Sequence, residues 1–547
     1  MRGESRCALH MLSASVLLAT SLFLAGCDNE EPATTSPRTA SGLKLLNQDW
    51  NDQQRETAWY TSFGSQIVPL PWFLALEDAN SQARFSRPDN LSRFGFASAG
   101  PSAANPHSLP IGLASTPPHK GEQWVGLGCS ACHSGQVYYR GERLHIDGGQ
   151  ALVDFQLFER EIIAALQATL ADEGKFQRFA QALQAGPELR QALQARRDRL
   201  SAVAALNATH IPYGRGRLDA FGQIFNAVAA DFLAIPENRR EPNAPVSYPV
   251  LWDAAHLDLV QWNGSAPNAG PGPLVQNATT GLAVFGDLNI HSDGMGYGST
   301  VEIDNLSTIQ DLWYRLSAPA WPQETLGTID GALAQQGADI YQQQCQACHV
   351  LSDQQDPDRE LTAKLVAVDA VGTDSTMASN FTNATSRSGA FEGQKLMYVG
   401  GATLGAEAPT IELVVHAALG ALLEHPWQSI KAGLYSFHKV QSAPLHERPY
   451  DYKARPLSGI WASAPYLHNG SVPTLAALLS TERPPRFAVG KVEFDPQAVG
   501  LSDQVLDEAQ VSRFDSHLPG NGNGGHLYGT GLAEADKRAL IEYLKTL

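Results

Sequence analysis

The pentapeptide Cys345-Gln346-Ala347-Cys348-His349 decides the fold of this chain. Two cysteines separated by two residues, the second followed at once by a histidine, are typical of a c-type haem attachment. The thiols form thioether bonds to the haem vinyl groups, and the adjacent imidazole reaches the iron as proximal ligand. A second copy, Cys129-Ser130-Ala131-Cys132-His133, lies upstream. A structural zinc site needs four closed ligands, and a redox dithiol needs no trailing histidine, so neither explains two identical patterns. The sequence therefore predicts two covalently bound haem c groups, with His133 and His349 as proximal ligands.

Composition narrows the class of protein. The chain has 547 residues, of which 43% are hydrophobic, which is enough to form cores for two or three domains. Its formal net charge of -17 argues against nucleic-acid binding, which depends on Lys and Arg. A solvated acidic surface is the simpler interpretation of this charge, and a basic electron-transfer partner is the alternative. Four of the six cysteines belong to the haem motifs, and Cys7 and Cys27 lie at the N-terminus, so no pair remains for a disulfide in the mature domains.

The N-terminus resembles a bacterial lipoprotein signal over residues 1–27. A positively charged start precedes an apolar run, which ends in Leu24-Ala25-Gly26-Cys27, a sequence similar to a lipobox. We expect Cys27 to be acylated and the protein to be periplasmic, attached to a membrane by its lipid alone. Asp28 favours the inner membrane. Residues 28–42 are mostly polar and carry two prolines, so they are expected to form a tether.

Two regions follow the tether. Residues 43–322 hold the first haem motif and a loop-rich extension, and residues 330–547 hold the second motif. Apolar periodicity predicts a helix over 154–185 and, after a break at Gly186-Pro187, a second helix that ends at about residue 205. It also predicts helices over 304–316, directly before Cys345 and over 532–547. The helix before Cys345 and the terminal helix are similar to the first and last helices of a cytochrome c, so the second region is expected to be a cytochrome c domain.

The segment Tyr452–Leu475, and above all Ala464-Pro465-Tyr466-Leu467-His468-Asn469-Gly470-Ser471, resembles the bacterial dihaem cytochrome c peroxidase superfamily. Within it the chain is most similar to the longer branch that includes the rubber oxygenases. The resemblance implies a mainly α fold of two cytochrome-c-like haem domains with long loop insertions. It also implies unequal haems: the one on His349 six-coordinate and electron-transferring, and the one on His133 with an open side for oxygen chemistry.

The second iron ligand of the His349 haem has two candidates. His526 lies in a glycine-rich loop, residues 519–529, which resembles the same region of the rubber oxygenases. His468 is the other candidate, although a structural histidine near a haem edge is its simpler interpretation. No methionine follows Met397, so the Met ligand of classical dihaem peroxidases is missing, which favours two histidines.

Residues around the reactive haem are harder to assign. Trp252 and Trp262 are candidates for lining its pocket or relaying electrons, and ordinary core packing is the alternative for both. Classical dihaem peroxidases use a distal glutamate to move the peroxide proton. Glu142 and Glu159 are near the first motif in sequence, but neither stands in a motif of that kind.

Three functions remain open. The first is a peroxidase-like oxidoreductase that reduces hydrogen peroxide with electrons passed from the His349 haem to the His133 haem, supplied by a small cytochrome c or cupredoxin. The second is an oxygenase that cleaves an apolar alkene, and the third is a non-catalytic dihaem electron carrier. The family often forms homodimers and commonly holds a calcium ion between its haem domains, but no calcium-loop pattern occurs in this sequence.

Overall fold

The computed structural model describes residues 38–118, 122–292, 294–436 and 450–547. The predicted signal with Cys27, and the tether as far as residue 37, lie outside the described residues. The described part of the chain forms one compact unit. No helix within it is long and apolar enough to cross a membrane.

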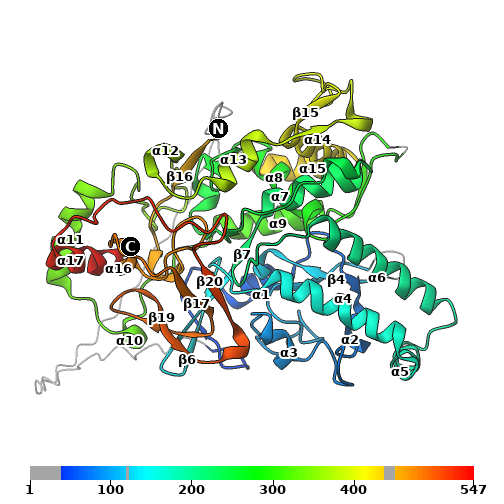
Figure 1. Cartoon of the computed structure of the whole chain (residues 1–547), viewed down its shortest axis with the longest axis horizontal. Coiled ribbons are helices and arrows are strands. Elements are labelled where there is room, and N and C mark those ends of the chain that lie inside the picture. Colours follow the sequence, from blue (N-terminus) through cyan, green and yellow to red (C-terminus); the bar gives the residue numbers. More distant parts are fainter. Residues whose placement is uncertain (1–37, 119–121, 293, 437–449) are drawn as a thin grey trace, which may run out of the picture. The chain divides into compact units, whose positions relative to one another are not determined.

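The fold is mixed α/β, with 39% of residues in helices and 17% in strands, so the predicted mainly α fold is wrong (Figure 1). The largest difference is a hairpin directly after His133, formed by β5 (Ser134–Tyr139) and β6 (Glu142–Asp147). Arg140 and Gly141 connect the strands with φ angles of 48° and 82°, the left-handed geometry that two-residue hairpin turns require. Neither strand alternates buried and exposed residues, so two-residue periodicity does not mark them in the sequence.

The five-stranded sheet joins the two predicted regions of the chain. Its order is β1-β6-β5-β18-β19, with β1 at Lys44–Leu45, β18 at Val492–Asp495 and β19 at Gly500–Val505. Glu493 of β18 pairs in parallel with Tyr138 of β5. The chain after the first haem motif is therefore fixed to a strand from the far end of the sequence, and the predicted boundary between 322 and 330 stays a prediction.

The other sheets are small. One has three strands in the order β2-β4-β3, and six are two-stranded ribbons. The three-stranded sheet contains β2 (Val68–Pro69), β3 (Leu113–Ser115) and β4 (Trp124–Leu127). The ribbons are β7 (Arg217–Leu218) with β8 (Val246–Ser247), β9 (Leu259–Val260) with β10 (Ala266–Pro267), β11 (Leu288–Asn289) with β12 (Gly298–Ser299), β13 (Lys364–Ala367) with β16 (Asp451–Ala454), β14 (Thr385–Arg387) with β15 (Glu407–Pro409), and β17 (Arg486–Gly490) with β20 (Val511–Asp515).

The predicted helices are confirmed, with one refinement. The helix expected over 154–185 is two helices, α4 (Phe155–Ala171) and α5 (Glu173–Leu183), because the Asp172 carboxylate accepts a hydrogen bond from the backbone of Lys175 and starts a new helix. The remaining helices are α1 (Asp52–Tyr60), α2 (Leu70–Ala75), α3 (Pro88–Arg93), α6 (Leu189–Leu206), α7 (Ala220–Phe225), α8 (Gly272–Ala283), α9 (Ile303–Tyr314), α10 (Gln323–Leu326), α11 (Gly331–Gln344), α12 (Val368–Val371), α13 (Thr376–Asn383), α14 (Thr410–Leu423), α15 (Pro426–Ser436), α16 (Leu475–Leu478) and α17 (Glu534–Leu544).

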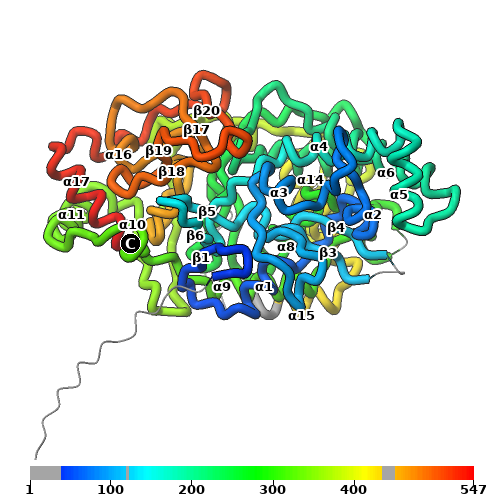
Figure 2. Tube along the Cα trace, turned by 90° about the horizontal axis from the view of Figure 1, so that it is seen from below, coloured from blue at the N-terminus to red at the C-terminus, as the bar shows by residue number. Residues whose placement is uncertain are grey.

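Helices α11 and α17 pack against each other beside the second haem motif. A β-carbon on Gly337 of α11 would overlap the carbonyl oxygen of Ala539 of α17, so glycine is what allows this close approach. Tyr341 and Tyr543 meet across the contact with ring centroids 5.2 Å apart. Figure 2 shows this pair at the opposite end from α5 and α6. The crossing directs the end of α11, and with it Cys345, towards the protein interior.

Candidate functional site

The first haem motif places His133 at the start of β5. Its cysteines begin a short 3-10 turn, Cys129–Ala131, directly after β4. The Nδ1 atom of His133 donates a hydrogen bond to the carbonyl oxygen of Pro249 at 2.8 Å. Burial lowers the pKa of His133 to about 4, so the imidazole is neutral, as a metal ligand must be. With Nδ1 occupied by a carbonyl, Nε2 is the nitrogen left for an iron.

A cavity of about 1550 Å³ lies beside this motif and is lined by Cys129, Cys132 and His133. Typical small-molecule pockets have volumes of about 300–1,000 Å³, so the space exceeds that of one ordinary ligand. Helices α7, α8 and α9 contribute to its walls. The thiols, the oriented imidazole and the adjoining space fit a covalently attached haem.

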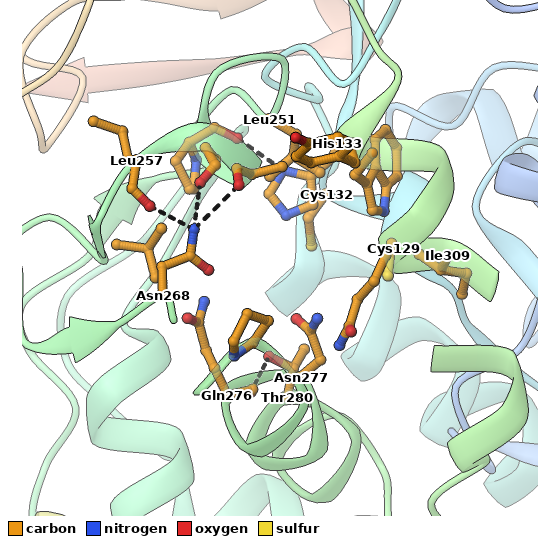
Figure 3. Close-up of a pocket in the computed structure, with 18 of the residues that line it drawn as sticks. Cys129, Cys132, His133, Leu251, Leu257, Asn268, Gln276, Asn277, Thr280 and Ile309 are labelled. Carbon is orange, nitrogen blue, oxygen red and sulfur yellow. Dashed lines mark hydrogen bonds between the residues drawn. The ribbon is translucent and has the colours of Figure 1, made fainter. Parts of the chain in front are cut away.

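Opposite His133 the cavity is lined by amides rather than by acids (Figure 3). Helix α8 presents Gln276, Asn277 and Thr280 (Figure 3); Gln276 and Asn277 lie four and three residues before Thr280, so each shares a helix face with it. The Gln276 Oε1 atom is buried and has no hydrogen-bond partner among the described residues. A buried, unpaired amide costs about 1–3 kcal/mol, which is a sign of a position that meets a ligand or water.

No second strong iron ligand is evident across the cavity. Among the described residues that line it, His256 is the one imidazole besides His133, and none is a methionine or a lysine. Both ring nitrogens of His256 lie 3.0 Å from backbone carbonyl oxygens, those of Arg359 and Tyr314. These contacts hold His256 in the wall of the cavity.

Five carboxylates line the cavity, Asp49, Asp258, Asp311, Asp358 and Glu360, and each is engaged in a contact with another group. Asp258 accepts a hydrogen bond from the backbone of Ala363, Asp311 pairs with Arg315, and Asp358 accepts one from Tyr314. The two glutamates considered from the sequence do not line the cavity: Glu142 pairs with Arg38 at 2.6 Å, and Glu159 lies on α4. None of these contacts places a free carboxyl group opposite His133.

The second motif faces an imidazole instead of a cavity. His349 donates from Nδ1 to the carbonyl oxygen of Arg455 at 2.7 Å, and Tyr341 donates to the carbonyl oxygen of His349, also at 2.7 Å. The ring of His526 lies across from His349 with centroids 6.1 Å apart. Metal–imidazole bonds are about 2.0 Å long, so the centroids of two rings on opposite sides of one metal ion are separated by about 6 Å, close to the 6.1 Å observed. The pair therefore fits a haem iron with two histidine ligands.

The loop that carries His526 is held by its backbone. The His526 amide donates to Val371 at 2.7 Å, and its φ of 47° lies in the left-handed region. Arg483 donates to the carbonyl oxygens of Asn523 at 2.6 Å and of His526 at 3.1 Å. The glycine-rich segment gives the loop the freedom to make this turn, and Arg483 fixes it.

The structure places the remaining predicted residues as follows. His468 is buried and stacks on Tyr452 with ring centroids 4.2 Å apart, and Trp262 lies 6.5 Å from it. Trp262 also lines the cavity, and its Nε1 donates to Ser247 at 3.0 Å. Trp252 is 1% exposed and outside the cavity lining, so it packs in the core.

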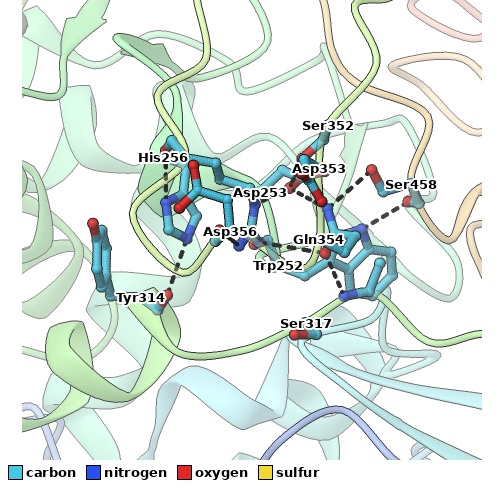
Figure 4. A network of polar contacts seen from close by, with 12 residues as sticks. Trp252, Asp253, His256, Tyr314, Ser317, Ser352, Asp353, Gln354, Asp356 and Ser458 are labelled. Carbon is cyan, nitrogen blue, oxygen red and sulfur yellow. Dashed lines mark hydrogen bonds and ion pairs between the residues drawn. The ribbon is translucent and has the colours of Figure 1, made fainter.

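Trp252 nevertheless connects the segments that hold the two histidines, and Figure 4 shows the polar contacts around Trp252 and Asp253. It lies three residues after Pro249, whose carbonyl holds His133, and its Nε1 donates at 2.8 Å to Ser458, three residues after Arg455. Beside it, Asp253 accepts hydrogen bonds from Ser352, Gln354 and Arg359 in the segment that follows His349. The two backbone segments that orient the proximal histidines are thus bonded to each other.

The two attachment sites also share one hydrophobic core. Cys129 and Cys345 both pack against a single buried cluster, which contains Trp252, Trp313 and Trp461. Trp313 of α9 lines the cavity as well. The sequence analysis did not single out Trp313, Gln276 or Asn277; the signal for the amides was a polar stripe on one face of a mostly apolar helix.

Comparison with known proteins agrees with this chemistry. Residues 451–488 match the family described as RoxA-like, cytochrome c-like. The segment covers the whole of the sequence element that resembled the dihaem superfamily, Tyr452–Leu475, and it indicates a haem-containing oxidoreductase with a cytochrome c-like domain. The assignment to the peroxidase superfamily as a whole goes beyond this match.

Two relatives extend the comparison beyond this segment. In an alignment of 630 residues that covers 100% of both chains, the chain is 30% identical to "Uncharacterized protein y4iJ" of Sinorhizobium fredii (strain NBRC 101917 / NGR234). It is 25% identical to "Uncharacterized protein y4iM" of the same strain, over 62% of this chain and 74% of that protein. The chain belongs to the family of the y4iJ protein.

The described residues contain no group of three or more His, Cys, Asp or Glu side chains that could hold a separate metal ion. The haem motifs are therefore where metal chemistry is to be sought in this part of the chain.

Proposed function

We propose that the protein is a dihaem oxygenase that acts on an apolar alkene at the His133 site. In this proposal His349 and His526 would hold a haem that transfers electrons, and His133 would hold the haem that meets the substrate. One observation carries this proposal: His349 faces an imidazole 6.1 Å away, whereas His133 faces a cavity of about 1550 Å³. Iron with two protein ligands has no position for a substrate, and iron with one protein ligand does.

The residues of the chain have defined tasks in this site. A haem at His133 would supply an iron position at which dioxygen binds. Cys129 and Cys132 anchor the macrocycle, and Pro249 fixes the imidazole through Nδ1. The Gln276 amide offers a hydrogen bond from the opposite side, and the apolar side chains of α7 and α9 exclude water and hold an apolar substrate.

The amide lining favours oxygen chemistry over peroxide cleavage. An amide donates hydrogen bonds but does not release a proton at neutral pH. Heterolytic cleavage of peroxide needs a group that moves a proton between the two oxygens. The carboxylates of the cavity are engaged in other contacts, so a substrate-oxidising reaction with dioxygen suits the site better.

Oxygen uptake by the purified dihaem protein tests the proposal. We expect oxygen consumption when a polyisoprene or a short isoprenoid alkene is added, and label from ¹⁸O₂ in carbonyl products detected by mass spectrometry. A saturated alkane of the same length is the matched control and should give neither. A protein with two haems that binds carbon monoxide but consumes no oxygen with any alkene would refute the oxygenase reaction.

Peroxide reduction is the second candidate, and the shared core favours it. Cys129 and Cys345 contact one tryptophan-rich cluster, an arrangement that suits electron delivery from the His349 haem to the His133 haem. A peroxidase depends on such delivery in every turnover. Steady oxidation of a reduced small cytochrome c or cupredoxin by hydrogen peroxide would support this candidate. Two irons that ignore oxygen, peroxide and carbon monoxide would leave an electron carrier.

The cellular location of the protein and its lipid anchor are also proposals. We propose a periplasmic lipoprotein anchored through Cys27, on the strength of the lipobox-like sequence. Labelling of the mature protein with a radioactive fatty acid, lost in a Cys27→Ala variant, tests it.

A further inference from the structure

Lys453 and Arg455 are two cations without a counter-ion at the end of strand β16. Lys453 donates one hydrogen bond, to the carbonyl oxygen of Leu259 at 3.3 Å. Neither side chain forms an ion pair with any described residue, and the Arg455 guanidinium donates no hydrogen bond to this part of the protein. Residues two apart along an extended chain point to the same side, so both cations face one region.

Both side chains are partly shielded from solvent, neither fully buried nor fully exposed. An unpaired charge in such a position is less well solvated than one at the open surface, so a nearby anion stabilises it. The acids whose charges act on these cations, Asp253 and Asp258, form no ion pair with either of them. Asp253 pairs with Arg359 at 3.1 Å and keeps one buried oxygen, Oδ2, without a partner, and Asp258 accepts from the backbone of Ala363 at 2.7 Å. Anionic groups from outside the chain would complete the site.

Backbone contacts place the pair between the two histidine sites. The carbonyl oxygen of Arg455 holds His349. The backbone amide of Lys453 donates to the carbonyl oxygen of Trp262 at 2.8 Å, and Trp262 lines the cavity next to His133. A group carried by either haem and directed towards this junction would meet both cations.

We propose that Lys453 and Arg455 bind haem propionate carboxylates at the junction of the two haem sites. The planar guanidinium matches a carboxylate with two parallel hydrogen bonds, and the ammonium acts as a point charge on a second oxygen. Two cations suit the two propionates of one macrocycle. The inference rests on the haem occupancy of the proposed function, but not on the reaction catalysed.

Resonance Raman spectra of the dihaem protein test this pairing, because the propionate-bending bands respond to hydrogen bonding at the carboxylates. We expect Arg455→Gln and Lys453→Gln each to shift one of these bands and to lower one midpoint potential, since a nearby cation stabilises the reduced haem. Lys364→Gln is the matched control: Lys364 is an exposed cation of the same ribbon, paired with Ala454, and its loss should change neither. Arg455→Lys keeps the charge and should preserve most of the potential.

Carbon monoxide identifies the haem concerned, because it alters the bands of the open haem alone. A shifted band that ignores carbon monoxide belongs to the His349 haem, and one that responds belongs to the His133 haem; either result supports the pairing. Unchanged bands and potentials in both glutamine variants, with two haems still bound, would overturn it. So would loss of a haem in Arg455→Gln that Arg455→Lys does not restore. If the unsubstituted dihaem protein consumes no oxygen with any alkene but the glutamine variants still shift the propionate bands, the proposed reaction is refuted and the propionate pairing is supported.

Discussion

Removal of the His526 imidazole should open the second iron. Two metal–nitrogen bonds of about 2.0 Å and the radii of two imidazole rings, about 1.1 Å each, together span about 6.2 Å. The observed separation of the His349 and His526 rings is 6.1 Å. This distance leaves room for one iron and nothing else, so we expect both rings to be ligands.

The substitution of choice is His526→Gly. The φ of His526 is 47°, a backbone conformation that glycine adopts without strain, so the change deletes the ligand while the loop keeps its path. Carbon monoxide bound by the fully reduced protein should rise from one per chain to two, measured by optical titration, and a low-spin ferric EPR signal should become high-spin. Added imidazole should restore that signal.

His468→Gln is the control for this experiment. His468 stacks on Tyr452 and makes no ring contact with His349 or His526 among the described residues, so its substitution should leave one carbon monoxide per chain. A His526→Gly protein that still binds one carbon monoxide and stays low-spin would refute the assignment of His526. Two molecules bound by the unsubstituted protein would refute the distinction between the two sites.

Three further outcomes are expected. Gln276→Leu should raise the carbon monoxide stretching frequency of the open haem in infrared spectra, because a hydrogen-bond donor is lost; an unchanged frequency would place the amide too far away. Gly337→Ala should destabilise the protein in urea by about 1–3 kcal/mol, since the added carbon overlaps Ala539, whereas Gly331→Ala, in open space on the same helix, should not. Burial raises the pKa of Glu159 from 4.5 to about 7, so the folded state holds its proton longer than the unfolded state. Below pH 4.5 the carboxyl group is protonated in both states and the folded state has its full stability. As the pH rises from 4.5 through 7 the free energy of unfolding falls, by at most about 3 kcal/mol. Relative to the unsubstituted protein, Glu159→Gln should therefore gain stability between pH 4.5 and 7; a pH-independent difference would contradict this.

The sequence by itself predicts the haem attachments. Thioether formation needs two thiols at a fixed spacing, and a histidine adjacent to the second thiol has little freedom to do anything but reach the iron. Local periodicity also determined most of the helices, because the spacing of apolar residues is a property of the segment alone. His526 could be proposed as a ligand from its glycine-rich surroundings, and its placement 6.1 Å from His349 gives that proposal a geometry.

Only the tertiary structure decided what each histidine faces. The cavity beside His133 is assembled from segments far apart in the chain, so the polar stripe on α8 could not by itself show that Gln276 and Asn277 line it. The pairing of β5 with β18 likewise depends on contact between distant segments, which is why the mainly α expectation failed. Lys453 and Arg455 stand out for the same reason: whether a partly shielded cation is neutralised depends on every element packed around it, and that is known only when the chain is folded.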